Sequence, residues 1–165
     1  RRHSFPTRRS SDLYELVQHQ LAIAERENRQ LSILAIDLDN FKVVNDEEGH
    51  AAGDQLLAAV ARRLEATIRA ADAAARMGGD EFSILLVDAG EESATETAHR
   101  LVAELGKPYP GIQTRVSASI GIAVYPQAGA DLAELLENAD RALYAAKRGG
   151  RNTCRLAGCA KTSEV

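Results

Sequence analysis

The chain has 165 residues, of which 45% are hydrophobic and 27% charged, and its formal net charge is −4. This length suits one domain with a sizeable core, and these proportions are typical of a soluble globular protein. The acidic balance argues against general nucleic-acid binding, which usually needs a basic face, and no apolar run approaches the roughly 20 residues of a membrane span. We expect no nucleic-acid partner, no membrane contact and a cytoplasmic location.

The two cysteines, Cys154 and Cys159, both lie near the C-terminus. With no further cysteine and no clustered histidine beside them, they make a poor metal site. A reduced pair in a cytoplasmic protein is the expected state.

The N-terminal segment, residues 1–13 (RRHSFPTRRSSDL), is basic and serine-rich and has neither a helical nor a strand period. From His3 onward it resembles the translation of a common DNA-sequencing adapter, so we interpret residues 1–13 as a cloning or assembly scar. A signal peptide is the competing interpretation, but no apolar segment follows the arginines. The native domain is then expected over residues 14–158, with a short tail at 159–165 and with upstream sequence, including any sensor domain, missing.

The first half of this domain is expected to contain helices around one buried strand. Apolar residues at helical spacing from Tyr14 to Ala24 predict the first helix. The run LSILAIDL, residues 31–38, is nearly all apolar and predicts a strand covered on both faces. Residues 40–50 are polar and indicate a short helix or loop, and an apolar repeat of four residues predicts a long helix over about 52–70.

A Gly-Gly turn lies at the centre of the chain. The stretch Arg76-Met77-Gly78-Gly79-Asp80-Glu81-Phe82 leads into an apolar run that ends at Val87. Paired glycines supply the positive φ that short turns need, so this pattern predicts two strands joined by a tight hairpin. The turn would present Asp80 and Glu81 at the tip of a sheet, where a metal ion and a phosphate could bind. An ordinary hairpin could carry the same residues.

Two helices alternate with two strands after the hairpin. Each helix starts with a residue pair at capping-box spacing, and the strands are short and apolar. The first of these helices is expected to start at the pair Ser93 and Glu96, and the strand 116–124 follows it. The second is expected to start at the pair Asp131 and Glu134 and to end at Gly149-Gly150, before the strand 152–156.

This order of elements predicts an α+β fold, a ferredoxin-like or nucleotidyl-cyclase-like sandwich with a mainly antiparallel sheet of about five strands flanked by helices. In that layout the first strand and the hairpin are neighbours, so Asp37 and Asp80 meet at one edge. Two carboxylates a few Å apart repel each other unless a cation lies between them, and hard oxygen ligands suit Mg²⁺ (or Mn²⁺). The alternative is that Asp37 and Asp39 are solvated charges at a strand end. We favour the metal site because Asp37 closes an otherwise apolar strand.

Several motifs occur along the chain in a fixed order. They are Asp37-Leu38-Asp39-Asn40-Phe41-Lys42, Asn45-Asp46, Gly49-His50 with Gly53-Asp54, the stretch from Gly78 to Phe82, Ser119-Ile120-Gly121, and Asp140-Arg141-Ala142-Leu143-Tyr144 with Lys147, Gly150, Arg151 and Asn152. This ordered set, which covers residues 14–156, resembles the GGDEF domain of the diguanylate cyclase family.

The resemblance implies that two GTP molecules condense to cyclic di-GMP with loss of two pyrophosphates. Each domain would bind one GTP, so the catalyst would be a homodimer. No permanent dimer interface is recognisable in the sequence, and we expect a transient one. The resemblance also implies the role of each motif residue. The metal ion would be bound by Asp37, the Leu38 carbonyl, Asp80 and Glu81, and Asp80 would also help to deprotonate the 3′-hydroxyl. The phosphates would be contacted by Lys42, Lys147 and Arg151, and the backbone would approach the nucleotide closely at Gly78 and Gly79.

Guanine selection would fall to Asn45 and Asp54. The Watson–Crick edge of guanine offers two adjacent donors, which a carboxylate can accept together, whereas adenine would present an acceptor to Asp54. The alternative for Asp54 is a capping role at a helix that starts near Gln55.

The stretch Arg69-Ala70-Ala71-Asp72 matches the RxxD inhibitory site of the family, and Arg100 falls where a second arginine often completes that site. There the arginine and aspartate bind the product. The alternative is an ion pair on a helix surface, which contributes little.

One departure from the family lies at the N-terminus, where the usual Asp-x-Leu-Thr-x-Leu-x-Asn-Arg turn is replaced by the adapter-like segment.

Two other functions stay open. A receptor domain would bind GTP or cyclic di-GMP without turnover, although such domains generally show a damaged signature. A different cyclase on the same scaffold would use another nucleotide.

Overall fold

The structure, a computed structural model, describes residues 8–158. The elements are β1 (Arg8–Arg9), α1 (Ser10–Glu27), β2 (Leu31–Asp39), α2 (Phe41–Glu48), α3 (His50–Thr67), β3 (Ala73–Gly78), β4 (Glu81–Val87), α4 (Glu91–Leu105), β5 (Ser117–Tyr125), α5 (Leu132–Arg148) and β6 (Thr153–Leu156). None of the helices in this range is long and apolar enough to cross a membrane.

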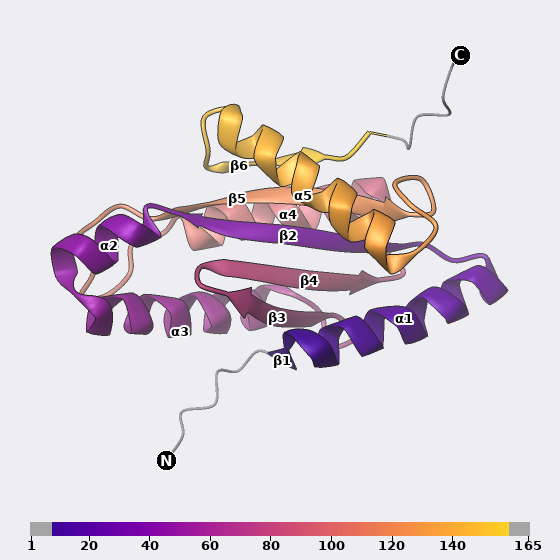
Figure 1. Cartoon of the computed structure of the whole chain (residues 1–165), viewed down its shortest axis with the longest axis horizontal. Helices are drawn as coiled ribbons and strands as arrows, with labels where there is room; N and C mark the ends of the chain where they lie inside the picture. The colour runs from indigo at the N-terminus through magenta and orange to yellow at the C-terminus, as the bar shows by residue number, and fades with distance from the viewer. Residues whose placement is uncertain (1–7, 159–165) are drawn as a thin grey trace.

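Within the described range the strands form one six-stranded sheet in the order β1-β3-β4-β2-β5-β6. The four central strands pair antiparallel, and each edge strand pairs parallel with its neighbour. Helix α5 crosses one face of the sheet and α4 lies behind the other (Figure 1). The predicted α+β sandwich is confirmed, and β2 is the neighbour of β4 as expected.

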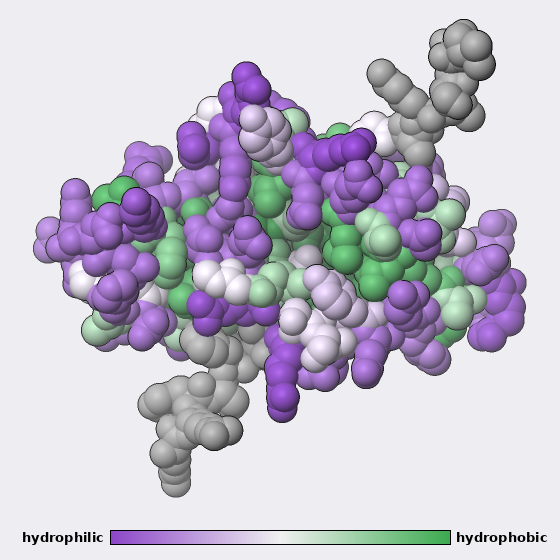
Figure 2. Space-filling view, viewed as in Figure 1, coloured by the Kyte–Doolittle hydropathy of each residue, from purple (hydrophilic) through white to green (hydrophobic). Residues whose placement is uncertain are grey.

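Alternating residues of the strands supply two apolar cores, one on each face. Leu34 and Ile36 of β2 join the core under α3 and α4. Ile33 and Ala35 of the same strand join the core under α1 and α5. A strand that is buried on both faces needs apolar residues at most positions, which explains the run LSILAIDL. On the face shown in Figure 2, apolar surface lies between α1 and α5, with polar side chains around it.

Helix α5 packs unusually close to β5. A Cβ at Gly121 would lie 2.1 Å from the carbonyl oxygen of Ala139 and 2.3 Å from the backbone nitrogen of Leu143. Glycine therefore lets the helix backbone rest directly on the strand. This contact brings the last turn of α5 over the end of β2, where the acidic residues lie.

The predicted hairpin is confirmed, with β3 and β4 joined at Gly78 (φ +148) and Gly79 (φ +50). The Arg76 guanidinium donates from Nε to the Gly79 carbonyl at 2.9 Å and so ties the turn to its own strand. Positive φ at both glycines accounts for their use here, because an L side chain would be strained.

Helix boundaries differ from the sequence-based prediction at several places. Helix α1 starts at Ser10, four residues before Tyr14, because Leu13 is 2% exposed and extends the apolar stripe of Val17 and Leu21 by one turn. Residues 8–13 thus take part in the fold. The scar interpretation of residues 1–13 concerns their origin and stays a prediction. Helix α3 spans His50–Thr67, two residues earlier at its start and three at its end than predicted.

One of the two predicted capping boxes is wrong. Helix α4 starts at Glu91 after Gly90, and Ser93 lies inside its first turn. Two acidic residues at the start favour this boundary through the helix dipole. The cap at Asp131 is confirmed, since its Oδ1 accepts a hydrogen bond from the backbone nitrogen of Glu134 at 2.9 Å.

Cys154 is buried in β6, and its Sγ lies 3.7 Å from Nδ1 of His99. Burial raises the pKa of the Cys154 thiol, so the reduced form is protonated and poorly reactive. Cys159 lies outside the described residues, so the predicted reduced pair stays a prediction.

Candidate active site

Two carboxylates meet where β2 ends beside the hairpin. Asp37 lies opposite Glu81 in the β2–β4 register, and the Leu38 backbone nitrogen donates to the Asp80 carbonyl at 3.3 Å. Burial, followed by hydrogen bonding with Asp37 and the negative charges of Asp37 and Glu81, raises the pKa of Asp80 from 3.8 to about 6. Burial and the neighbouring negative charges thus favour the protonated form of Asp80.

Asp37 is 7% exposed and lies at the centre of this group. Its Oδ2 pairs with Nζ of Lys147 from the last turn of α5. Its Oδ1 is buried and receives no hydrogen bond from any donor within residues 8–158. A buried carboxylate oxygen without a donor is costly unless a cation or a proton contacts it. This oxygen, beside the raised pKa of Asp80, fits a divalent cation.

The described residues contain no group of three or more His, Cys, Asp or Glu side chains arranged to hold a metal ion. The two aspartates would need additional oxygen ligands, such as the Leu38 carbonyl and substrate phosphates. Mg²⁺ is commonly bound in this way, by one or two carboxylates plus phosphates and water.

Glu81 lies on the same sheet face as Asp37 and lines a cavity of about 140 Å³ between α1, β4 and α5. Tyr14, Met77 and Asp140 also line this cavity. Burial raises the pKa of Asp140, and the positive charge of Lys147 opposes that shift. Glu81 thus faces the cavity beside the acid pair, and its assignment as a metal ligand stays a prediction.

The two predicted guanine-binding residues lie together at the junction of α2 and α3. Asn45 is on α2, and its Oδ1 would lie 1.9 Å from a Cβ placed on Gly53 of α3. Asp54 is the next residue and is exposed. It lies within α3, whose N-cap is Gly49, so the alternative role of Asp54 as a helix cap is wrong.

The three predicted phosphate-binding residues are spread over two elements and one loop. Lys42 is exposed in the first turn of α2. Lys147 pairs with Asp37, and Arg151 is exposed in the α5–β6 loop with φ +63. The structure therefore joins Lys147 directly to the acid pair.

The predicted RxxD pair lies in a turn after α3, so it is not an ion pair on a helix surface. The Asp72 side chain is 2% exposed. Its carboxylate accepts hydrogen bonds from the backbone nitrogen and guanidinium of Arg69 and from the Val87 nitrogen at 3.0 Å. Arg69 also donates to the Val87 carbonyl, and its side chain is 56% exposed. Asp72 thus fixes Arg69 against the end of β4.

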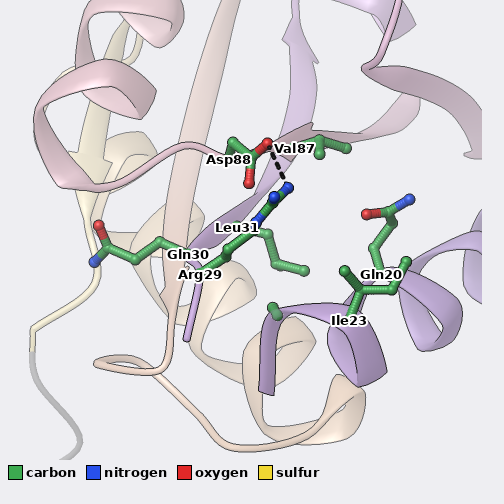
Figure 3. A pocket seen from close by; sticks show the side chains of 8 residues that line it. Gln20, Ile23, Arg29, Gln30, Leu31, Val87 and Asp88 are labelled. Carbon is green, nitrogen blue, oxygen red and sulfur yellow. Dashed lines mark hydrogen bonds and ion pairs between the residues drawn. The ribbon is translucent and has the colours of Figure 1, made fainter. Parts of the chain in front are cut away.

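The end of β4 also borders a small cavity of about 10 Å³, with Gln20 and Ile23 from α1 on one side (Figure 3). There Arg29 donates to Asp88 at 3.4 Å. A space of this size holds about one water molecule and no ligand. Arg100 lies on α4, where its guanidinium donates to Thr97 at 3.2 Å. No contact within the described range brings Arg100 onto Arg69 and Asp72.

Comparison with known proteins identifies the family. The family model described as "Diguanylate cyclase, GGDEF domain" matches residues 5–153. The chain belongs to the GGDEF family. A bifunctional diguanylate cyclase/cyclic di-GMP phosphodiesterase of Pseudomonas aeruginosa, MucR, is 46% identical over 143 residues, which are 85% of this chain and 21% of MucR. This GGDEF domain thus spans about a fifth of that relative.

Solved structures of GGDEF domains have the same fold. The GGDEF domain of YfiN (TpbB) from Pseudomonas aeruginosa is 37% identical, with a TM-score of 0.87 over 92% of this chain and 96% of that one. The GGDEF domain of DgcB from Caulobacter crescentus in complex with c-di-GMP is 28% identical, with a TM-score of 0.82 over 95% and 98%. Diguanylate cyclases of this family generally need a divalent metal ion.

Two acidic residues of this GGDEF domain make contacts with distant parts of the chain that were not predicted from the sequence. Asp39 is buried and accepts hydrogen bonds from β5 and from the α5–β6 loop. Glu48 accepts from the backbone nitrogens of Gln113 and Thr114, which lowers the pKa of Glu48. A signal for Asp39 was available: it is two residues after Asp37 on one strand, so both lie on the same face. Nothing local pointed to Glu48.

Proposed function

We propose that this domain is a diguanylate cyclase that condenses two GTP into cyclic di-GMP and releases two pyrophosphates. The observation that carries the proposal is the pairing of Asp37 with Asp80, in which one buried carboxylate oxygen has no donor and the pKa of the second carboxyl is raised to about 6. Membership of the GGDEF family gives the same assignment.

Asp37, the Leu38 carbonyl and Asp80 are the proposed holders of Mg²⁺ or Mn²⁺, with Glu81 close by. A divalent ion there would neutralise phosphate charge and lower the pKa of the attacking hydroxyl. The exposed Gly78-Gly79 turn leaves the space in front of the acids open, since no atom lies within 4 Å of a Cβ placed on either residue.

Asp80 is the proposed acceptor of the proton from the 3′-hydroxyl of GTP. The raised pKa of Asp80 holds without a metal ion, and a bound cation would lower it while also lowering the pKa of the attacking hydroxyl. The 3′-oxygen then forms a bond to the α-phosphorus of the other GTP, and pyrophosphate leaves.

Lys147, Lys42 and Arg151 are proposed to bind the terminal phosphates. Lys147 compensates the charge of Asp37. We propose that it turns to the phosphates once a cation takes over that task. Asn45 and Asp54 are proposed to select guanine, supported by their adjacent positions across the α2–α3 junction.

A cyclic product needs two 3′-hydroxyls and two α-phosphates, and each domain offers one nucleotide site. Two domains must therefore face each other across a two-fold axis, and we propose that this dimer is transient. Because its proposed substrate is GTP, we place the domain in the cytoplasm.

Feedback by cyclic di-GMP is proposed through the exposed guanidinium of Arg69, oriented by the buried Asp72. An arginine can bind guanine or phosphate in a bidentate way. The second candidate function is a receptor that binds cyclic di-GMP there without turnover. The observation that favours it is the set of hydrogen bonds by which Asp72 holds Arg69 in place.

The test is to incubate the purified domain with Mg²⁺ and either GTP or ATP and to identify products by chromatography and mass spectrometry. We expect cyclic di-GMP from GTP and no cyclic product from ATP. Tight binding of cyclic di-GMP without turnover of GTP at high protein concentration would favour the receptor instead.

A further inference from the structure

Asp39, the last residue of β2, is a buried carboxylate outside the proposed catalytic roles. It is 5% exposed and lies opposite Ser117 in the β2–β5 register. Since alternate residues of a strand share a face, Asp39 lies on the same side of the sheet as Asp37.

The carboxylate of Asp39 joins three separate segments. Its Oδ2 accepts a hydrogen bond from the Ser117 hydroxyl at 2.6 Å, and its Oδ1 accepts one from the Ser119 hydroxyl at 2.9 Å. Its Oδ2 also accepts from the backbone nitrogen of Asn152 at 3.1 Å. The first two bonds tie neighbouring strands together, whereas the third reaches a loop 113 residues away in sequence.

That loop, between α5 and β6, has a backbone that side chains rarely adopt. Gly150, Arg151 and Asn152 have consecutive φ values of +110, +63 and +48. A residue other than glycine in the left-handed region is uncommon and costs free energy, so the surrounding structure must stabilise it. The Arg151 nitrogen bonds back to the Ala146 carbonyl at 3.1 Å, and Asp39 fixes the following residue.

The end of β2 therefore contacts both ends of the segment from Lys147 to Asn152. Asp37 pairs with Lys147 at its start, and Asp39 accepts from Asn152 at its end. Arg151 lies between these two anchors. Hydrogen bonds that a backbone nitrogen donates to a carboxylate are charge-assisted and are among the stronger ones in proteins.

We infer that Asp39 is a positioning residue, which sets the α5–β6 loop so that Arg151 and Lys147 meet the terminal phosphates of GTP. Asp39 itself would not touch the nucleotide. This inference rests on the proposed function, because it takes the two basic residues as phosphate contacts. The competing role is a purely structural link between β2 and β5 through the two serines.

The experiment compares the affinity for 3′-deoxy-GTP, which lacks the attacking hydroxyl, with the affinity for GMP, which lacks the terminal phosphates. Both are measured by calorimetry with Mg²⁺. Asp39→Ala should weaken 3′-deoxy-GTP binding by about tenfold, the scale of one lost charge-assisted bond, and change GMP binding by less than about twofold. Asp39→Asn keeps one oxygen acceptor for the Asn152 nitrogen, so its loss should be smaller, at about threefold.

The matched control is the double variant Ser117→Ala/Ser119→Ala, which removes both strand-to-strand bonds and keeps the bond to the loop. It should leave the ratio of the two affinities unchanged. On an Arg151→Ala background, Asp39→Ala should lose most of its effect on 3′-deoxy-GTP, because the two act through the same contact. Thermal unfolding followed by circular dichroism shows which variants are folded. If Asp39→Ala does not fold, Asp39→Asn replaces it in the comparison.

Equal losses for GMP and 3′-deoxy-GTP, full additivity with Arg151→Ala, or the same change in the serine control would each overturn the inference. If Arg151→Ala weakens triphosphate binding while both Asp39 variants do not, the inference alone fails. If Arg151→Ala also leaves triphosphate binding unchanged, the phosphate assignment in the proposed function fails with it.

Discussion

Replacing Asp80 with asparagine should stabilise the metal-free domain at neutral pH while it abolishes turnover. The pKa of Asp80 is raised from 3.8 to about 6, mainly by burial and then by Asp37, so the folded state binds this proton more tightly than the unfolded chain does. The stability that this proton contributes is fully present below pH 3.8 and is lost as the pH rises through about 6. Asparagine resembles the protonated carboxyl at every pH, so the variant keeps the folding stability that the wild type loses when Asp80 ionises.

The size of the effect follows from the shift. About two pKa units correspond to a ceiling of about 3 kcal/mol. Asp80 is partly exposed, and solvent screening reduces the expected gain to about 1 kcal/mol. For a domain of this size, that gain raises the thermal midpoint by about 2–4 °C.

The assay is thermal unfolding by circular dichroism in EDTA at pH 7.5 and at pH 4.5. The advantage of Asp80→Asn should be present at the higher pH and shrink at the lower one. Glu25→Gln, which removes an exposed charge on α1, is the control and should change neither midpoint by more than about 1 °C. With Mg²⁺ and 3′-deoxy-GTP the order should reverse, since ligand binding stabilises only the protein that can hold the metal. An asparagine variant that is no more stable than the wild type at pH 7.5 in EDTA would refute the reasoning.

Four further predictions concern other parts of the site. Asp54→Ala should weaken GTP binding by about 1.5–3 kcal/mol with little change in the thermal midpoint, and unchanged affinity by calorimetry would remove Asp54 from guanine recognition. Gly53→Ala should keep the fold but impair GTP binding, because the new Cβ would lie 1.9 Å from Oδ1 of Asn45; a normal KM for GTP would contradict this. Arg69→Ala should preserve initial rates yet relieve inhibition by added cyclic di-GMP, and an equally inhibited variant would exclude Arg69 from feedback. Specific activity should rise with protein concentration and with a coiled coil fused ahead of Arg8; a constant value on dilution, or a stable ligand-free dimer by light scattering, would show that the domain carries its own dimer contacts.

The order of elements and the convergence of Asp37 with Asp80 could be predicted from the sequence because both rest on local patterns. An apolar run ending in an aspartate and a Gly-Gly pair between two short strands each specify an element, and their order specifies which strands are neighbours. The register then brings Asp37 opposite Glu81 without further information.

The contacts that organise the site could not be predicted, because they join residues far apart in sequence. Lys147 pairs with Asp37 across 110 residues, and Asp39 reaches Ser117 across 78. An ion pair on a helix surface was the alternative for Asp72, and the burial that excludes it depends on the Val87 nitrogen, which no local pattern indicates. The start of α1 and the cap of α4 were misplaced because packing of Leu13 and a glycine N-cap outweighed the local signals.

The central claim is that Asp37 and Asp80 form the metal and proton-accepting site of a diguanylate cyclase. The most direct measurement follows pyrophosphate and cyclic di-GMP together, from GTP and Mg²⁺, for the wild type and Asp80→Asn at equal high concentration. We predict two pyrophosphates for each cyclic di-GMP from the wild type and neither product from the folded variant. Near-normal formation of both products by Asp80→Asn, or pyrophosphate release without cyclic di-GMP from the wild type, would contradict the account.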